Sequence, residues 1–372
     1  MSAIPASKVV AGDLVGSLTD ESWVYFLCNV GDGDAQLVLL PAENGTRKAM
    51  VVDAYTDKVV RLIDELTDSG LLPGADDIAL VVASHPHQDH ISSMPRLFRE
   101  HGDRIGEFWD PGYFHPIAAY TNLMKELQQR RDRITYAQPT AGLRRWISGT
   151  LVTVLSPAVG LRNRFDTYGT EINDSSLSLR IDHPAARVTS RDNLGRLVGA
   201  KSPSSSLVLG GDAQTLSWSH VMVDFPYLPS STSEAAQAIA AATGSKDLLR
   251  TDVVKISHHG SKRGVNLELM ERFAASVVLV SSRPRDTSSH GFPHLITQEV
   301  IREVKEPVAT HLQGVRKRAD WEHQVYYTHD QDDAGAVLGS IGIVFRGAAR
   351  HLWRFGDDRL DPISMARARR RI

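Results

Sequence analysis

Apolar residues gather in short runs along the first part of the chain, and glycine, asparagine or aspartate separates one run from the next. Such runs are typical of buried β-strands. Their spacing predicts a meander whose last strand delivers the residues HPHQDH at its C-terminal end. The runs are WVYFLC at 23–28, AQLVLL at 35–40, KAMVVD at 48–53 and DIALVVAS at 77–84.

The segment KVVRLIDELTDSG, which separates the third run from the fourth, has helical periodicity. Val59, Leu62, Ile63 and Leu66 recur at the spacing that places side chains on one face of a helix. Gly70 follows them, and glycine commonly ends a helix. We therefore predict a helix that ends at this glycine.

The strand pattern resumes beyond the histidine-rich segment and a helical stretch that follows it. Further helices are expected around 266–275 and 297–305. The strand-like runs are TLVTVLSP at 150–157, SSLSLRID at 175–182, SSLVLGGD at 205–212, DVVKISHHGS at 252–261, SVVLVSS at 276–282, HQVYYT at 323–328 and GSIGIVF at 339–345.

Two polar stretches, 184–206 and 229–246, interrupt this pattern and are predicted to be surface insertions, because strand signals resume on both sides. We expect one domain at 23–350, built of two sheets flanked by helices. An N-terminal extension at 1–22 precedes it, and a C-terminal segment at 351–372 follows. That segment ends in MARARRRI, which is typical of a solvated basic tail, with an electrostatic contact to nucleic acid as the alternative.

Composition limits the class of protein. The 372 residues are 42% hydrophobic, which is enough for a globular core. The formal net charge of −2 excludes binding to nucleic acid by bulk positive charge. Cys28 is the only cysteine, which excludes a disulfide framework and a cysteine-rich zinc site. A poor signal sequence and the lack of a long apolar run predict a cytoplasmic protein without membrane insertion.

The segment HPHQDH carries the strongest chemical signal. In an extended segment residues i and i+2 point to the same side, so His85 and His87 can converge on one cation. Asp89 and His90 follow where the chain turns into a helix, close enough to serve a second cation. We therefore predict a metal site with two divalent ions.

Such a short cluster needs further ligands from distant parts of the chain. Asp212 follows an apolar strand through a glycine pair, and a carboxylate there can bridge two metals. Its alternative role is to cap the next helix. His258 and His259 end another apolar strand and offer a ligand and its neighbour. The order His-x-His-x-Asp-His, then Asp, then His is a specific pattern.

With this pattern the sequence resembles the metallo-β-lactamase superfamily. The branch it resembles most is the hydrolase domain of the competence protein ComEC and its free-standing relatives. The resemblance covers about 23–346, and the segments that carry it are NVGDGDAQLVLL, MVVDAY with Asp53, HPHQDH, NDSSLSLRI from Asn173, Gly211 with Asp212, HHGS from His258, and VYYTHDQ with GSIGIVF.

The resemblance implies an α/β fold, the four-layer αββα metallo-β-lactamase sandwich, and two divalent metal ions. Zinc is the superfamily's usual metal, and nuclease-like members also use manganese. A third histidine found elsewhere in the superfamily is absent here, so the position beside His85 and His87 is left to water, a substrate oxygen, Asn173 or Asp174. The family has a late GHP segment, and Phe292 stands here in place of its histidine. A neighbouring histidine, His290 or His294, can compensate for this change.

The resemblance also implies roles for the residues. Asp89 binds one metal and orients a metal-bridging hydroxide that acts as the nucleophile. We favour His258 as the ligand because it directly follows its strand, which leaves His259 to protonate the leaving group or to hold substrate. Asp53 is expected to support a ligand. Other residues expected near substrate or ligands are Asn173, Ser176, Ser261, Lys262 and His294.

The same surroundings favour an anionic substrate. Ser261, Lys262 and Arg263 offer a hydroxyl and two cations, as recognition of a phosphodiester needs, although a solvated basic turn explains them equally. We therefore predict a two-metal hydrolase of phosphodiesters, a nuclease or phosphodiesterase, with nucleic acid as a candidate partner. The alternatives are a hydrolase of a small ester, lactone or thioester, and a non-catalytic metal-binding subunit.

Overall fold

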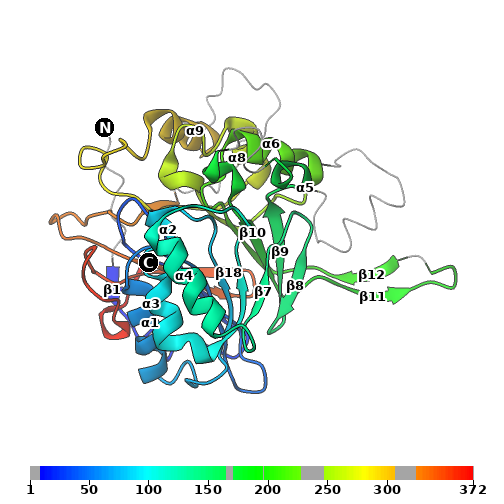
Figure 1. Ribbon diagram of the computed structural model, residues 1–372, viewed down its shortest axis with the longest axis horizontal. Helices are drawn as coiled ribbons and strands as arrows, with labels where there is room; N and C mark the ends of the chain where they lie inside the picture. The colour runs from blue at the N-terminus through cyan, green and yellow to red at the C-terminus, as the bar shows by residue number, and fades with distance from the viewer. Residues whose placement is uncertain (1–8, 165–170, 196, 228–246, 306–323, 372) are drawn as a thin grey trace.

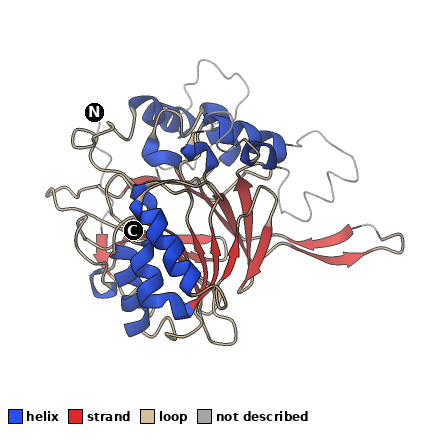
Figure 2. Ribbon diagram, in the orientation of Figure 1, coloured by secondary structure: helices blue, strands red, loops and turns tan. Residues whose placement is uncertain are grey.

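The chain folds into two large β-sheets that pack face to face, with helices on both outer faces (Figures 1 and 2). This arrangement is seen in a computed structural model that describes residues 9–164, 171–195, 197–227, 247–305 and 324–371. The predicted four-layer αββα architecture is thereby confirmed. None of the helices in these ranges is long and apolar enough to cross a membrane.

The first sheet has ten strands among the described residues, in the order β1-β19-β18-β17-β2-β3-β4-β5-β6-β7. These strands are β1 (Val9–Ala11), β2 (Trp23–Leu27), β3 (Ala35–Leu39), β4 (Ala49–Ala54), β5 (Ile78–Val82), β6 (Ile105–Trp109), β7 (Thr135–Ala137), β17 (Ile341–Arg346), β18 (Ala349–Arg354) and β19 (Arg369–Arg371).

The predicted meander is correct for β2, β3 and β4 and wrong for its last step. β2 to β4 pair antiparallel, but β5 runs parallel to β4. The reason is the helix between them, α1 (Lys58–Asp68), which carries the chain back along the sheet before β5 begins. Val59, Leu62, Ile63 and Leu66 are all buried, as the periodicity predicts.

The second sheet has seven described strands, in the order β16-β15-β14-β13-β10-β9-β8, and β13 to β16 are parallel to one another. These strands are β8 (Arg144–Ile147), β9 (Thr150–Ser156), β10 (Ser178–His183), β13 (Ser205–Leu209), β14 (Val253–Lys255), β15 (Val277–Val280) and β16 (Val325–Tyr327).

Helices cover the outer face of each sheet (Figure 1). Those near the first sheet are α1, α2 (Gln88–Ile91), α3 (Met94–His101) and α4 (Ala118–Gln129), and those near the second are α5 (Val159–Arg162), α6 (Thr215–Asp224), α8 (Leu267–Phe273) and α9 (Leu295–Lys305). Short 3-10 turns are η1 (Gly102–Arg104), η2 (Ile172–Ser175), η3 (Ser257–Gly260) and η4 (Met365–Arg367).

The layers explain why the central strands are apolar runs rather than alternating patterns. In β2, Trp23, Tyr25 and Leu27 face the core between the sheets, whereas Val24 and Phe26 face the core beneath the helices. Both sides of the strand are therefore dry, and every residue of β2 is buried. A third core lies between the second sheet and its helices.

The ends of the chain take part in the first sheet. β18 crosses the boundary that was predicted between residues 350 and 351, and β19 pairs with both β18 and β1. Arg369–Arg371 therefore form a paired strand rather than a disordered tail, although Arg369 and Arg370 stay exposed to solvent. Backbone pairing holds this arginine-rich strand, and the guanidinium of Arg371 lies 4.6 Å from the centre of the Tyr326 ring, a cation–π contact.

The segment predicted as an insertion at 184–206 contains a two-stranded hairpin. It consists of β11 (Arg187–Arg191) and β12 (Leu197–Lys201), which pair antiparallel and extend away from the sandwich (Figure 1). The other predicted insertion, 229–246, lies outside the described residues.

Candidate metal centre

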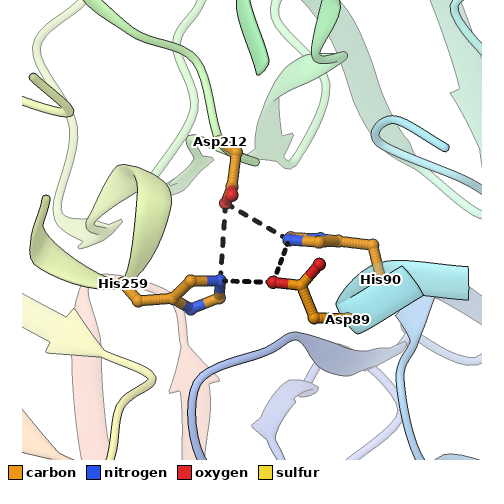
Figure 3. Close-up of side chains that lie close together, drawn as sticks. All are labelled: Asp89, His90, Asp212 and His259. Atoms are coloured by element: carbon orange, nitrogen blue, oxygen red, sulfur yellow. Dashed lines mark ion pairs between the residues drawn. The ribbon is translucent and has the colours of Figure 1, made fainter. Parts of the chain in front are cut away.

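The predicted site residues follow three strands that end at one edge of the sandwich. The histidine-rich segment follows β5 of the first sheet, whereas Asp212 follows β13 and the histidine pair follows β14 of the second sheet. Side chains from both sheets therefore meet across the gap between the layers, and Figure 3 shows four of them.

Four of these side chains form one compact group: Asp89, His90, Asp212 and His259. One ligand atom from each lies within 4.8 Å of all the others. His90 Nε2 is 3.3 Å from Asp212 Oδ1, and His259 Nε2 is 3.7 Å from both Asp212 Oδ1 and Asp89 Oδ2 (Figure 3). These four residues are called the tight group below.

The tight group has the property expected of a cation site. His90 Nε2, Asp212 Oδ1 and His259 Nε2 are buried, and none of them forms a hydrogen bond with any described residue. Leaving a buried polar atom unpaired costs about 1–3 kcal/mol. A divalent cation held by these two nitrogens and the carboxylates would satisfy all three atoms, so the residues fit a metal ion of the zinc or manganese type.

A second set of side chains lies on the other side of Asp212. Asp212 Oδ2 is 3.9 Å from His85 Nε2 and 3.7 Å from His258 Nε2, and His85 Nε2 is in turn 3.0 Å from His87 Nδ1. His85, His87 and His258 are called the outer histidines below. Asp212 thus presents one carboxylate oxygen to each set, an arrangement that a bridging ligand requires.

The histidine pair after β14 divides between the two sets. His259 belongs to the tight group and His258 to the outer histidines, whereas strand geometry had favoured His258 as the ligand and left His259 for catalysis. Both residues have a positive φ of 51° within η3, so the chain turns sharply here and the alternation of a strand does not continue. Both imidazoles therefore reach Asp212, from different sides.

Burial and nearby charge act in opposite directions on these groups. Burial alone would lower the pKa of His90, but the carboxylates of Asp212, Asp53 and Asp89 outweigh it and raise the pKa well above the ordinary value. Burial would raise the pKa of Asp212, yet the neighbouring histidines hold it well below its usual range. In the absence of a cation, the tight group therefore keeps a protonated histidine beside ionised carboxylates.

The outer histidines behave differently. Burial lowers the pKa of His85, and the positive charge of His90 lowers it further. Burial is also the largest cause of the lowered pKa of His87 and of His258. These three imidazoles are therefore held neutral, which is the form that binds a metal.

Buried groups hold the rings of the tight group from behind. His90 Nδ1 is 2.8 Å from Asp53 Oδ2, and that carboxylate also accepts hydrogen bonds from the backbone and hydroxyl of Ser84. His259 Nδ1 lies 3.1 Å from the backbone oxygen of Ser281. The geometry fits the supporting role that was expected of Asp53.

The remaining predicted residues lie around this centre, and their contacts differ. Ser176 Oγ accepts a hydrogen bond from the backbone of Asp212, and Asn173 Nδ2 lies 3.4 Å from His258 Nε2. Asp174 instead accepts hydrogen bonds from Ser217 at the start of α6, so it acts as part of that helix end.

In the basic turn after the histidine pair, one of the three side chains is buried and another forms an ion pair. Ser261 is buried, Lys262 is exposed, and the guanidinium of Arg263 is 3.0 Å from the carboxylate of Glu171. His294 donates its backbone N–H to Gly260 and accepts a hydrogen bond at Nδ1 from the backbone of Ile296.

Three residues near the centre were missed from the sequence. Asp34 and Lys255 are buried and form an ion pair, and Asp34 Oδ1 lies 3.8 Å from His259 Nδ1. His115 lies beside His87, with ring centres 5.6 Å apart. Asp34 stands in the segment NVGDGDA that supports the family resemblance, but nothing in the sequence indicates its partner.

No known family profile matches the sequence, and no curated protein matches it either. Solved structures with a similar fold include YhfI, a metallo-β-lactamase fold protein from Bacillus subtilis. It is 12% identical to this chain, with a TM-score of 0.38, and the match covers 76% of this chain and 93% of that one. The short form of human tRNase Z is 10% identical, with a TM-score of 0.35 and coverage of 70% and 92%. The ComEC-like branch stays a prediction.

Proposed function

We propose that this protein is a metal-dependent hydrolase that cleaves phosphodiesters with two divalent cations. The observation that carries the proposal is the tight group, in which three buried ligand atoms of His90, Asp212 and His259 have no hydrogen bond within the described chain. Without a cation these atoms have only ion pairs of 3.3–3.9 Å with one another and with Asp89, and no hydrogen bond within the described chain.

The ligands divide between two cations. Asp89, His90, His259 and Asp212 Oδ1 would hold one, and the outer histidines with Asp212 Oδ2 would hold the other. His258 then occupies the place of the third histidine that the sequence lacks. Nitrogen and carboxylate ligands without thiolate suit zinc, manganese or iron. When bound, such cations supply positive charge that acidifies water and stabilises the charge that develops on a phosphate.

The protein's own side chains have separate tasks around these cations. Asp89 is the most exposed member of the tight group, so its carboxylate would accept a hydrogen bond from an attacking water and orient it. The neighbouring histidines outweigh the effect of burial and keep the pKa of Asp89 low, so it stays ionised at neutral pH. Asp212, which is buried and ionised, offers one carboxylate oxygen to the tight group and the other to the outer histidines.

The preference for a phosphodiester rests on charge at the rim. Lys262 is exposed on the turn that follows the outer His258, where it can attract an anion. Arg263 shares its charge with Glu171, and both side chains are more than half exposed, so this pair is weak and open to exchange with a phosphate. A neutral lactone or ester would gain nothing from the positive charges of Lys262 and Arg263.

The experiment combines metal analysis with a substrate panel. Metal-restored wild type and Asp212→Ala are tested on single- and double-stranded DNA, RNA, bis-p-nitrophenyl phosphate and a lactone. Asp224→Ala, an exposed position on α6, serves as the matched control. We expect the wild type and the control to cleave a phosphodiester and Asp212→Ala to be inactive. No phosphodiester cleavage by the metal-loaded wild type would overturn the proposal, and faster lactone turnover would favour the second candidate.

A further inference from the structure

A buried ion pair lies directly behind the tight group. Asp34 precedes β3 in the first sheet and Lys255 ends β14 in the second, and neither side chain has any exposed surface. The Lys255 ammonium contacts Asp34 Oδ2. The pair therefore joins the two sheets at the level where the metal ligands leave them.

Asp34 contacts two members of the tight group, Asp89 and His259. Its backbone N–H donates to the backbone oxygen of Asp89, and its backbone oxygen accepts from Tyr55. Its carboxylate Oδ1 lies 3.8 Å from His259 Nδ1 and has no hydrogen bond to any described residue. One residue thus contacts the turn that carries Asp89 and the ring that comes from the opposite sheet.

The surroundings of Asp34 explain why a lysine faces it. Ligand atoms of Asp34, Asp53 and His90 lie within 4.8 Å of one another, so two carboxylates share a dry interior. A third metal ion does not suit this place, because Lys255 already supplies a cation to Asp34 and Asp53 already contacts His90 Nδ1. The ammonium provides the positive charge that two such carboxylates need.

Stability alone is a poor reason for such a pair. Removing two charges from water costs about as much as their attraction returns, and apolar replacements are often neutral or stabilising. We propose that Asp34 and Lys255 are positioning residues, whose contacts across the two sheets set the spacing of Asp89 and His259 and so the affinity of the tight group for its cation. This inference rests on the proposed metal centre but not on its substrate.

The test measures metal binding rather than turnover. The metal-stripped full-length protein is titrated with cobalt(II) and zinc(II), and both the affinity and the visible spectrum of the cobalt form are recorded. Lys255→Met is compared with Lys58→Met, which breaks another buried lysine–aspartate pair, to Asp357, that touches no predicted ligand. We expect Lys255→Met to weaken the tighter binding event by about 10–100-fold and to alter the cobalt spectrum, the scale found for residues that support metal ligands.

A second variant separates positioning from folding. The double variant Asp34→Leu/Lys255→Met removes both charges, so it is expected to regain thermal stability relative to Lys255→Met while its metal binding stays weak. Cobalt binding in this variant with wild-type affinity and spectrum would overturn the inference, and so would equal losses in Lys255→Met and Lys58→Met. Wild type that binds metal but cleaves no phosphodiester would instead contradict only the proposed function.

Discussion

The two sides of Asp212 differ in how their histidines are held. On the Oδ1 side, Asp53 contacts Nδ1 of His90, and the backbone oxygen of Ser281 contacts Nδ1 of His259. On the Oδ2 side, Nδ1 of His85 lies 3.1 Å from the hydroxyl of Ser84, but Nδ1 of His87 faces His85 and Nδ1 of His258 has no hydrogen bond to a described residue.

The difference indicates an order of binding. A ring that is fixed from behind loses little freedom when it binds a cation, whereas an unsupported ring must be ordered by the cation itself. The tight group should therefore bind the first cation and the outer histidines the second, with lower affinity. Since Asp212 serves both, the second event should depend on the first.

Asp212→Ala removes the residue that both sides share, and it should have the largest effect. The change removes the carboxylate from both sides and leaves His90 and His259 without their main counter-charge. We expect loss of both cations and a fall in the rate of hydrolysis of about 10³-fold or more, the scale seen when a central catalytic group is removed. Metal content and initial rates measure the effect. Two retained cations would contradict the bridging role.

The pair His259→Ala and His258→Ala tests the two sides against each other. His259→Ala should remove the first binding event, and His258→Ala should leave it intact while it weakens the second. We expect the affinity of the first event to differ between the variants by at least about 10-fold, or about 1.4 kcal/mol. Calorimetric titration with zinc measures both events. Equal effects of the two changes would show that the sides are not distinct.

Asp53→Asn tests the support behind His90. The amide is similar in shape but lacks the charge that holds Nδ1–H, so the affinity of the first cation should fall by about 10–100-fold. The second event should change only through its dependence on the first. Ser217→Ala is a suitable control, because that residue is equally buried but lies in α6 and donates its hydroxyl to the backbone oxygen of Asp174. An unchanged first affinity in Asp53→Asn would refute the supporting role.

The stability of the metal-free protein should also distinguish the sides through its pH dependence. Burial opposes protonation of His90 and His259, but the surrounding carboxylates together outweigh it and raise the pKa of both, so their contribution is lost as the pH rises above about 6.5. Burial lowers the pKa of His85 and His87, so stability falls as the pH drops below about 6.5.

Urea unfolding in the presence of a chelator, at a series of pH values, measures this smallest effect. The free energy of unfolding should be greatest near the ordinary pKa of histidine and decline on both sides. His90→Gln should remove most of the decline on the alkaline side only. A free energy that keeps rising above that pH would contradict the charge assignment in the tight group.

Much of this molecule could be predicted from local patterns. The runs that form β2, β3 and β4 are mostly apolar, with Gln36 and Asp53 as buried exceptions, because a strand between two layers has no wet side, and this requirement is visible in the sequence. The segment HPHQDH and Asp212 were recognisable for a similar reason, since polar ligands that directly follow a buried strand have few structural explanations.

Other features depend on contacts that no local pattern records. The direction of β5 follows from the crossover by α1, and the arginines of β19 are held by pairing with β1 at the opposite end of the chain and with β18. The assignment of His258 and His259 to different sides depends on a left-handed turn, which two adjacent histidines do not announce.

Burial and ligand chemistry are properties of single residues and short segments, so the layered fold and the residues that gather at one edge of the sandwich could be predicted from the sequence. Which atoms face each other depends on how distant segments pack. Asp34 and Lys255 are 221 positions apart, and their contact exists because two sheets meet there. Packing between distant segments sets the spacing of charges, and that spacing determines where a cation can bind.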